Sequence, residues 1–265
     1  MSIFSTPVTD TETLELNLKR PYFISDLHLD VNRQKDFACF SRFIREHQEN
    51  FDELVILGDF FDYWVGDDAI GTAHDYIEVL RELSKNKKLF IMHGNRDFML
   101  GGEFAKTIGA ALLTDPTRAV IGDKHYLLSH GDIWCTRDSD YQKVRARVRS
   151  FAWQWFVLRL PLAKRLDIAR NARNKSHEKK MEKPVEAMDV VNEAILDHCS
   201  KETIGIIHGH THRPGQYCVS DTVNRWVIPD WRHGEDNDLT IGFIAFENGE
   251  PCIEMATYDA KEIAK

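Results

Sequence analysis

The sequence predicts an α/β protein with a helical block inserted between two halves of its core. Three observations support this prediction. Short apolar segments alternate with segments of helical spacing in the first half of the chain, the pattern of strands joined by crossover helices. Helical spacing dominates from about 141 to 199, and short apolar segments return after 203. We therefore expect a core formed by residues 18–134 and 201–265, with a helical cap at 135–200.

The first half contains three candidate strands with two helices between them. Residues 21–30 (PYFISDLHLD), 53–62 (ELVILGDFFD) and 88–97 (KLFIMHGNRD) each begin with an apolar run and end in polar residues. The second of these runs is continuously apolar, as expected for a strand buried on both faces. Residues 35–48 and 73–83 carry apolar side chains at helical spacing. This order predicts right-handed crossovers within one sheet.

The second half begins with short strands from about 118, including 125–132 (HYLLSHGD). A long helical stretch follows, and we expect it to break at Pro161 and Pro184 because proline cannot continue a helix. The later strands are expected at 203–214, 226–229, 239–246 and 252–258.

Composition is that of a globular protein. The 265 residues are 43% hydrophobic and include six Trp, fifteen Phe and seven Tyr, which is enough apolar surface for a core and excludes a disordered chain. No run reaches the roughly 18 apolar residues that span a bilayer. The five cysteines are scattered, without a Cys-x-x-Cys pair, so we expect neither a disulfide framework nor a thiolate zinc site. The N-terminal sequence lacks a secretory pattern, and we expect a soluble, reduced, cytosolic protein.

Positive charge is concentrated in one segment. The chain has a net charge of −8, yet residues 143–180 hold twelve Lys and Arg against two acidic residues. Such a segment suits an anionic partner, or it is simply the solvated face of helices. The acidic remainder disfavours long nucleic acid as that partner. No feature of the sequence indicates an obligate protein partner.

Residue types that bind metals follow five of the apolar strands. In open α/β sheets ligands bind beyond the carboxyl ends of the strands, so these clusters can converge. Carboxylate, amide and imidazole groups suit Mn, Fe, Zn or Mg, and a carboxylate can bridge two ions. Each cluster alone is a weak signal, but five in this order indicate one metal site. The clusters are Asp26-Leu27-His28, Gly58-Asp59-Phe60-Phe61-Asp62, Gly94-Asn95-Arg96-Asp97, His130-Gly131-Asp132 and Gly209-His210-Thr211-His212.

The order of these motifs resembles the calcineurin-like metallophosphoesterase superfamily, over the span from Asp26 to about His233. The resemblance implies a two-sheet αββα sandwich with an inserted helical cap and two divalent metal ions. Water activated by these ions would attack phosphorus, with no covalent nucleophile. His208 has no place in the pattern, and we expect a hydrogen-bonded core histidine there. The implied ligands are Asp26, His28 and His212 for one ion, Asn95, His130 and His210 for the other, and Asp59 as the bridge.

Arg96 narrows the substrate class. Many members of the superfamily have His at this position, where it assists the leaving group. Arginine does not readily donate a proton, but its two-pronged guanidinium grips phosphate oxygens. A leaving group of low pKa, such as a phosphate, needs no strong acid. A pyrophosphate linkage therefore fits Arg96 better than an alkyl phosphodiester does.

Longer motifs resemble the UDP-2,3-diacylglucosamine hydrolase family of lipid A biosynthesis: 58–67 (GDFFDYWVGD), 93–98 (HGNRDF), 135–142 (CTRDSDYQ), 187–190 (AMDV) and 208–214 (HGHTHRP). The resemblance implies Mn²⁺-dependent cleavage of UDP-2,3-diacylglucosamine at the α-phosphorus, giving UMP and 2,3-diacylglucosamine 1-phosphate. It also implies a peripheral position on the anionic cytoplasmic face of the inner membrane. The implied catalytic residues are Asp59, Asn95 and Arg96, and the implied substrate contacts are Asn95, Arg96, Asp138, Ser176, Lys180, Lys183 and His210.

The cap also carries an apolar, aromatic strip at 151–162, bordered by cationic residues. Beside a site for a diacylated sugar nucleotide, we interpret this strip as an acyl-chain groove or a bilayer contact. The alternative is a buried cap helix whose cations extend to solvent. Two other functions stay open. One is a general two-metal phosphodiesterase or nucleotide pyrophosphatase with a soluble substrate, which the strip disfavours; the other is a catalytically weak scaffold, which the complete ligand set disfavours.

Overall fold

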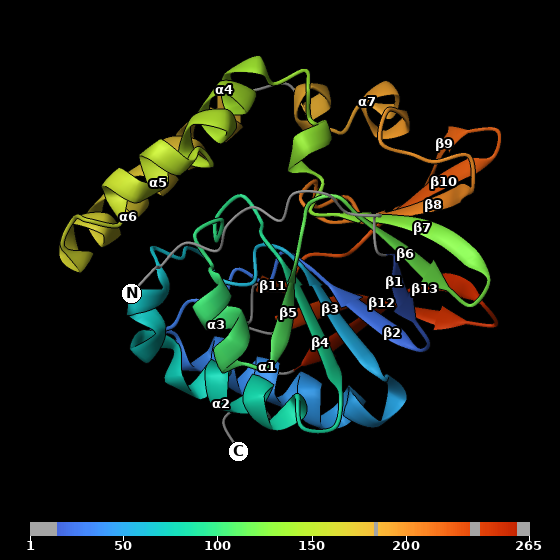
Figure 1. Cartoon of the computed structure of the whole chain (residues 1–265), viewed down its shortest axis with the longest axis horizontal. Helices are drawn as coiled ribbons and strands as arrows, with labels where there is room; N and C mark the ends of the chain where they lie inside the picture. Colours follow the sequence, from blue (N-terminus) through green and yellow to red (C-terminus); the bar gives the residue numbers. More distant parts are fainter. Residues whose placement is uncertain (1–14, 183–184, 234–238, 259–265) are drawn as a thin grey trace.

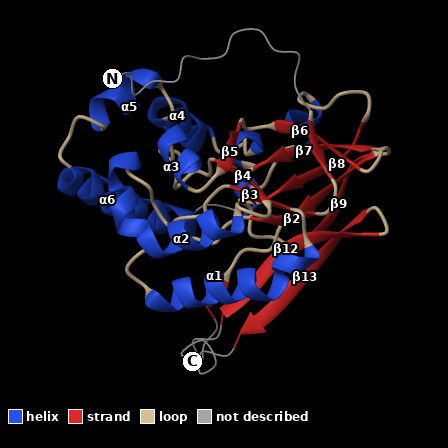
Figure 2. Ribbon diagram, turned by 60° about the horizontal axis from the view of Figure 1, so that its bottom comes forward, coloured by secondary structure: helices blue, strands red, loops and turns tan. Residues whose placement is uncertain are grey.

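The protein is a sandwich of two β-sheets with helices outside them (Figure 1). The computed structural model describes residues 15–182, 185–233 and 239–258, and their side chains except at 174–182 and 185–186. The sandwich confirms the predicted αββα class. Helices α1–α3 cover the outer face of one sheet, as seen in Figure 2.

The first sheet has seven strands and contains the alternating first half of the chain. Strands β2 to β5 run parallel, and the three helices connect them in order. These strands and helices are β2 (Pro21–Ile24), α1 (Gln34–His47), β3 (Glu53–Leu57), α2 (His74–Leu83), β4 (Lys88–Met92), α3 (Gly102–Thr107) and β5 (Ala110–Leu113). On the other side of β2, the antiparallel strands are β12 (Leu239–Glu247), β11 (Arg232–His233) and β13 (Glu250–Tyr258).

The second sheet has six strands in the order β1-β6-β7-β8-β10-β9. Its central strands β7 and β8 run parallel, although more than 70 residues separate them in the sequence. The helical block lies within that separation. The strands are β1 (Leu16–Leu18), β6 (Thr117–Ile121), β7 (Lys124–Ser129), β8 (Thr203–His208), β9 (Gly215–Ser220) and β10 (Val223–Val227).

Successive side chains of a strand point to opposite faces of its sheet, so the core has one layer between the two sheets and another beneath the helices. In β3, Val55 and Leu57 face the second sheet, while Leu54 and Ile56 pack under the helices. This arrangement explains the continuously apolar run, since both faces of the strand are buried. In β7, Leu127 points away from the sandwich and packs against the short helices η3 (Asp132–Trp134) and α7 (Asn192–Leu196).

The helical block forms an arm that runs across the top of the sandwich in Figure 1. It comprises α4 (Ser139–Val148), α5 (Phe151–Val157) and α6 (Leu162–Glu182), followed by η4 (Val185–Met188). The expected break at Pro161 is present, and Pro184 lies outside the described residues. A further break falls at Ser150, whose extended backbone ends α4 and whose hydroxyl caps α5 by accepting the Trp153 N–H at 3.4 Å.

Two further features of the fold concern short strands and membrane crossing. Strands β1, β5, β9 and β11 were not expected from the sequence. Strands β1 and β11 have only three and two residues, too few to show an alternating pattern. Among the described helices, none combines the length and hydrophobicity that crossing a membrane requires.

Candidate metal centre

The loops after five strands bring the predicted ligands together at one edge of the sandwich. Asp26 and His28 follow β2, Asp59 follows β3, and Asn95 follows β4. The loops after β7 and β8 contribute the remaining histidines, His130, His210 and His212. All five strands end at this edge, so residues separated by up to 186 positions become neighbours.

One group contains Asp26, His28 and His212. The Nε2 atoms of the two histidines lie 3.5 Å apart, and Nε2 of His212 lies 3.5 Å from Oδ1 of Asp26. The opposite nitrogen of His212, Nδ1, lies 2.7 Å from Oδ2 of Asp230. That carboxylate accepts a hydrogen bond from Nδ1–H and leaves Nε2 as the nitrogen that can bind a metal.

A second group contains Asn95, His130 and His210. Oδ1 of Asn95 lies 3.0 Å from Nε2 of His130 and 2.8 Å from Nδ1 of His210. Nδ1 of His130 lies 2.9 Å from the Leu57 carbonyl oxygen, which can only accept a hydrogen bond. Nδ1 of His130 therefore carries a proton, and Nε2, which faces Asn95, is the nitrogen left to bind a metal.

Asp59 lies between these two groups. Its Oδ2 is 3.7 Å from Nδ1 of His28, and its Oδ1 is 3.8 Å from Nε2 of His130. Asp26, Asp59 and His130 also place one ligand atom each within 4.8 Å of one another. A carboxylate in this position can contact ions on both sides.

The backbone at the site is held in an uncommon conformation. Asp26, His28, Asp59, His210 and His212 all have positive φ between 49° and 68°, a region that non-glycine residues rarely occupy. Two close approaches require glycine. A Cβ on Gly94 would lie 2.0 Å from Oδ1 of Asp59, and one on Gly209 would lie 2.3 Å from Oδ2 of Asp26.

The environment of the site fits a divalent cation. Oδ1 of Asp26 and Nδ1 of His28 are buried and have no hydrogen-bond partner, as expected for atoms that ligate a metal. Burial raises the pKa of Asp59, because a buried charge is unfavourable. Burial alone would lower the pKa of His212, but the carboxylates of Asp230 and Asp26 raise it to about 9. The negative charges of these buried carboxylates are unfavourable unless positive charge lies beside them, and bound metal ions supply that charge.

Arg96 lies at the rim of the site and is partly exposed. Its Nη1 donates to Oδ1 of Asp62 at 2.9 Å, and its Nε lies 3.7 Å from Oδ2 of Asp59. Asp62 is almost fully buried and also pairs with Arg173 of α6. The guanidinium is therefore anchored on one side and faces the ligands on the other.

Three aspartates with structural roles at the site were not predicted. The buried carboxylate of Asp97 accepts backbone N–H groups from the β3 and β4 loops, including those of Phe60 and Gly94 at 2.8 Å each. Asp62 holds Arg96, and both of these aspartates lie within motifs singled out from the sequence. Asp230 lies outside the five clusters, in the loop after β10, so its contact with His212 was not predicted.

The predicted substrate contacts are only partly described. Asn95, Arg96 and His210 lie at the site. Asp138 caps α4, its Oδ1 accepting the Tyr141 N–H at 3.1 Å. The side chains of Ser176 and Lys180, and the whole of Lys183, lie outside the described residues, so their proposed contacts stay predictions.

His208 is the buried core histidine that was expected. It is fully buried, with Nδ1 2.8 Å from the Gly209 carbonyl and Nε2 3.2 Å from a guanidinium nitrogen of Arg225. Burial and the Arg225 charge lower its pKa to about 4, so the ring is neutral near pH 7.

The aromatic strip of the arm is largely exposed. Phe151, Trp155 and Phe156 are 65%, 40% and 60% exposed, whereas Val157 is buried. This exposure is inconsistent with a buried cap helix. The border of cations also needs correction, because three of them are used inside the protein. Arg145 and Arg149 bind Asp132, and Arg165 is buried against Asp68.

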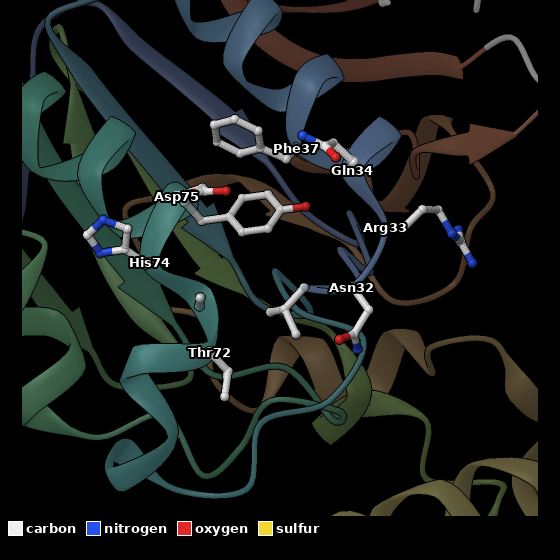
Figure 3. Close-up of a pocket in the computed structure, with 10 residues that line it drawn as sticks. Asn32, Arg33, Gln34, Phe37, Thr72, His74 and Asp75 are labelled. Carbon is white, nitrogen blue, oxygen red and sulfur yellow. The ribbon is translucent and has the colours of Figure 1, made fainter.

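A cavity of about 210 Å³ lies apart from the ligands, between the beginnings of α1 and α2 (Figure 3). Asn32 and Gln34 line one side, and Thr72 and His74 the other. None of the seven predicted metal ligands is among its lining residues. We therefore place the chemistry at the strand ends and not in this cavity.

Comparison with known proteins identifies the family. A family model described as calcineurin-like phosphoesterase matches residues 19–214. The chain belongs to this family. Proteins of Azotobacter vinelandii, Chromohalobacter salexigens and Tolumonas auensis, each named UDP-2,3-diacylglucosamine hydrolase, are 39%, 40% and 40% identical to it. The matches cover 78%, 82% and 82% of this chain and 89%, 91% and 89% of the relatives.

Both resemblances seen in the sequence are thereby confirmed. A calcineurin-like phosphoesterase is a hydrolase with a divalent metal site, and the side chains at the strand ends of this member are the candidate ligands. The two groups around Asp26 and Asn95, with Asp59 between them, provide carboxylate, amide and imidazole donors for such a site.

Proposed function

We propose that this protein hydrolyses the pyrophosphate bond of UDP-2,3-diacylglucosamine by attack of water at the α-phosphorus. The products are UMP and 2,3-diacylglucosamine 1-phosphate, an activity that belongs to lipid A biosynthesis. The observation that carries the proposal is the convergence of seven ligand-type side chains and Arg96 on one edge of the sandwich. The names of the relatives, at 36–40% identity over most of the chain, support this substrate.

Two Mn²⁺ ions are the proposed cofactor. Asp26, His28 and His212 are the proposed ligands of the first ion, and Asn95, His130 and His210 those of the second. Asp59 is the shared ligand. When bound, such a pair of ions lowers the pKa of water and offsets the negative charge of the phosphates.

The protein's own residues prepare these ligands for binding. Asp230 accepts a hydrogen bond from Nδ1–H of His212, and the Leu57 carbonyl accepts one from Nδ1–H of His130. The Nε2 atoms of both rings can therefore bind metal. Asp97 fixes the loop before Asn95 by accepting the Gly94 N–H at 2.8 Å. The geometry is therefore largely set before metal binds, which lowers the entropic cost of assembling the site.

Arg96 is the proposed clamp on the pyrophosphate. Asp62 holds Nη1, and the remaining N–H groups of the partly exposed guanidinium can donate to phosphate oxygens. These contacts would strengthen as charge develops on the leaving phosphate. The sugar phosphate leaves as an anion of low pKa, so no side chain has to protonate it.

The arm α4–α6 is the proposed binding surface for the acyl chains and the membrane. Phe151, Trp155 and Phe156 expose large aromatic surfaces, and the Arg159 guanidinium lies 3.3 Å from the Trp155 ring centroid. Exposed aromatic residues beside cations suit the interface of an anionic bilayer. We place the protein at the cytoplasmic face of the inner membrane as a peripheral protein, with residues 135–200 as the cap on a core of 18–134 and 201–265.

Phosphorus NMR of the reaction in ¹⁸O-labelled water tests the proposal directly. We expect Mn²⁺-dependent conversion of UDP-2,3-diacylglucosamine, with the label in UMP because water attacks the α-phosphorus. Label in the sugar phosphate would place the attack on the other phosphorus and refute the mechanism. Equal turnover of an unacylated UDP-sugar would favour a nucleotide pyrophosphatase with soluble substrates.

A further inference from the structure

Helix α4 is docked on the core through the buried carboxylate of Asp132, and Arg145 also lies 3.6 Å from the buried carboxylate of Asp115. Asp132 is fully buried and lies two positions after His130. Its Oδ2 accepts hydrogen bonds from two side chains of α4, Tyr141 Oη at 2.6 Å and Arg145 Nε at 2.8 Å. It also accepts one at 3.4 Å from Nη2 of Arg149, the residue that ends α4. Charged hydrogen bonds of this kind are strong when shielded from water.

Arg149 also reaches a second loop. Its Nη2 donates to the Gly94 carbonyl oxygen at 2.9 Å, and Gly94 directly precedes Asn95. One guanidinium thus connects the loop after β4 with the loop after β7. Those loops carry Asn95 and His130, which are both proposed ligands of the second metal ion.

The proposed ligands of the first ion are fixed by other contacts. Asp26 accepts the backbone N–H of His210 at 2.7 Å, and its carbonyl accepts that of Trp231 at 3.2 Å. His212 is oriented by Asp230. These contacts come from the loop after β8 and the segment after β10, and none of them involves Arg149.

We propose that Arg149 is a positioning residue for the second metal ion. It holds the Asn95 and His130 loops at the spacing that the ion needs, so occupancy of this one site depends on the docking of α4. The inference rests on the ligand assignment of the proposed function. It gives α4 a role besides covering the substrate, since the cap then contributes to assembling the metal centre that it overlies.

The choice of arginine follows from the two acceptors. A guanidinium presents several donors in a rigid plane and can serve a carboxylate and a carbonyl at once. Lysine keeps the charge but concentrates it at one nitrogen on a flexible stem. Arg149→Lys should therefore retain part of the effect, whereas Arg149→Gln should lose most of it.

The test is Mn²⁺ binding by the purified full-length protein, without any substrate. Equilibrium dialysis gives the number and affinity of bound ions, and electron paramagnetic resonance detects the spin coupling of two neighbouring Mn²⁺ ions. We expect the parent to bind two ions with a coupled spectrum. Arg149→Gln should bind the first ion like the parent and the second about 10- to 100-fold more weakly, as is typical for loss of an outer partner of a metal site. Its spectrum at limiting Mn²⁺ should be that of a single ion.

Arg147→Gln is the matched control, because Arg147 is an exposed arginine on the same helix. It should behave like the parent, and Arg149→Lys should lie between the parent and Arg149→Gln. Circular dichroism checks that each variant is folded. Should Arg149→Gln fail to fold, Arg149→Lys decides the matter by the same criterion. Two ions bound with parental affinities, or an equal loss at both sites, would overturn the proposal. A parent that binds fewer than two ions would instead refute the ligand assignment, and this proposal with it.

Discussion

Asp59 contacts both groups of candidate ligands, and its single charge is expected to serve two ions. Replacing it with Asn keeps the shape and the acceptor for the Arg96 N–H, which lies 2.8 Å from Oδ1. The shared negative charge is lost, and with it several kcal/mol of metal-based charge stabilisation. We expect turnover of UDP-2,3-diacylglucosamine to fall at least about 10³-fold.

The same variant should fold well without metal. Burial raises the pKa of Asp59, so the charged form is unfavourable in the metal-free protein and a neutral isostere relieves that cost. Thermal unfolding in a chelator should show a melting temperature equal to or above that of the parent. A clear drop would mean that Asp59 supports the fold rather than the chemistry.

Arg96 tests the pyrophosphate assignment. Arg96→Lys keeps the positive charge but cannot use two donors on phosphate while a third binds Asp62. We expect kcat to fall about 10²-fold, the usual effect of losing one donor to developing charge. Arg96→His should shift preference toward alkyl or aryl phosphodiesters, because it restores a proton donor for the leaving group. Kinetics on both substrate types measure the shift, and an unchanged profile in both variants would reduce Arg96 to a turn residue.

The site residues that lie within motifs could be found from the sequence. Which of them would face the metal site and which would support the loops could not. Asp59, Asn95 and Asp97 all belong to metal-type clusters after strands. Only the structure shows that the Asp97 carboxylate accepts backbone N–H groups and so supports the loops after β3 and β4. Asp230 lies outside the five clusters, and its partner His212, 18 residues away, is brought to it by the parallel pairing of β8 with β10.

Among the elements, α5 gives the clearest prediction. Trp155 and Phe156 expose aromatic surface that the fold does not bury. If acyl chains or bilayer cover them, replacing both with Ser should raise KM for the lipid substrate severalfold or more, at about 0.8 kcal/mol per methylene removed from water. Turnover of a small chromogenic phosphoester should stay at the parental rate, because the ligands lie on the strand-end loops.

Two controls separate surface from core. Met255→Ser removes an equally exposed apolar side chain from β13, away from the arm, and should change neither activity. Val157→Ala creates a small cavity at the buried residue of α5 and should lower the melting temperature instead. If the double Ser variant behaves like Val157→Ala and loses both activities equally, the strip belongs to the core.

Length alone did not decide which elements were predictable, since the four-residue β2 was expected and the six-residue β9 was not. The parallel strands β2 to β4 and their helices are visible as runs of four or more apolar residues and helical spacing. The break at Ser150 was missed because Arg149 and Ser150 show no proline or glycine signal. The Ser150 cap and the tertiary hydrogen bond from Arg149 to the Gly94 carbonyl both lie at this break, and neither is visible in the sequence.

At the scale of the molecule, the charge pattern means something different from its first interpretation. The basic segment is not one uniform anion-binding surface. Arg145 and Arg149 bind the buried carboxylate of Asp132, and the buried guanidinium of Arg165 pairs with the exposed Asp68. These pairs make the position of the arm specific to the acidic residues beneath it. The exposed cations of the arm include Lys143 and Arg147 on α4, and Arg159 beside α5, which stacks on Trp155.

Metal binding should stabilise the whole molecule. The loops from five strands, in both sheets, meet at the site, so ions that bind only the folded protein connect the two layers of the sandwich. At a hundredfold excess over the dissociation constant, one ion adds about 2.7 kcal/mol to the free energy of unfolding. For a domain of this size that corresponds to a rise in melting temperature of about 5–10 °C. Thermal scans at increasing Mn²⁺ should show this rise, a chelator should reverse it, and Asp59→Asn should reduce it. Mg²⁺ at the same concentration should give a smaller rise, because imidazole ligands favour Mn²⁺ over Mg²⁺. A melting temperature independent of Mn²⁺ would contradict a metal centre built from these loops.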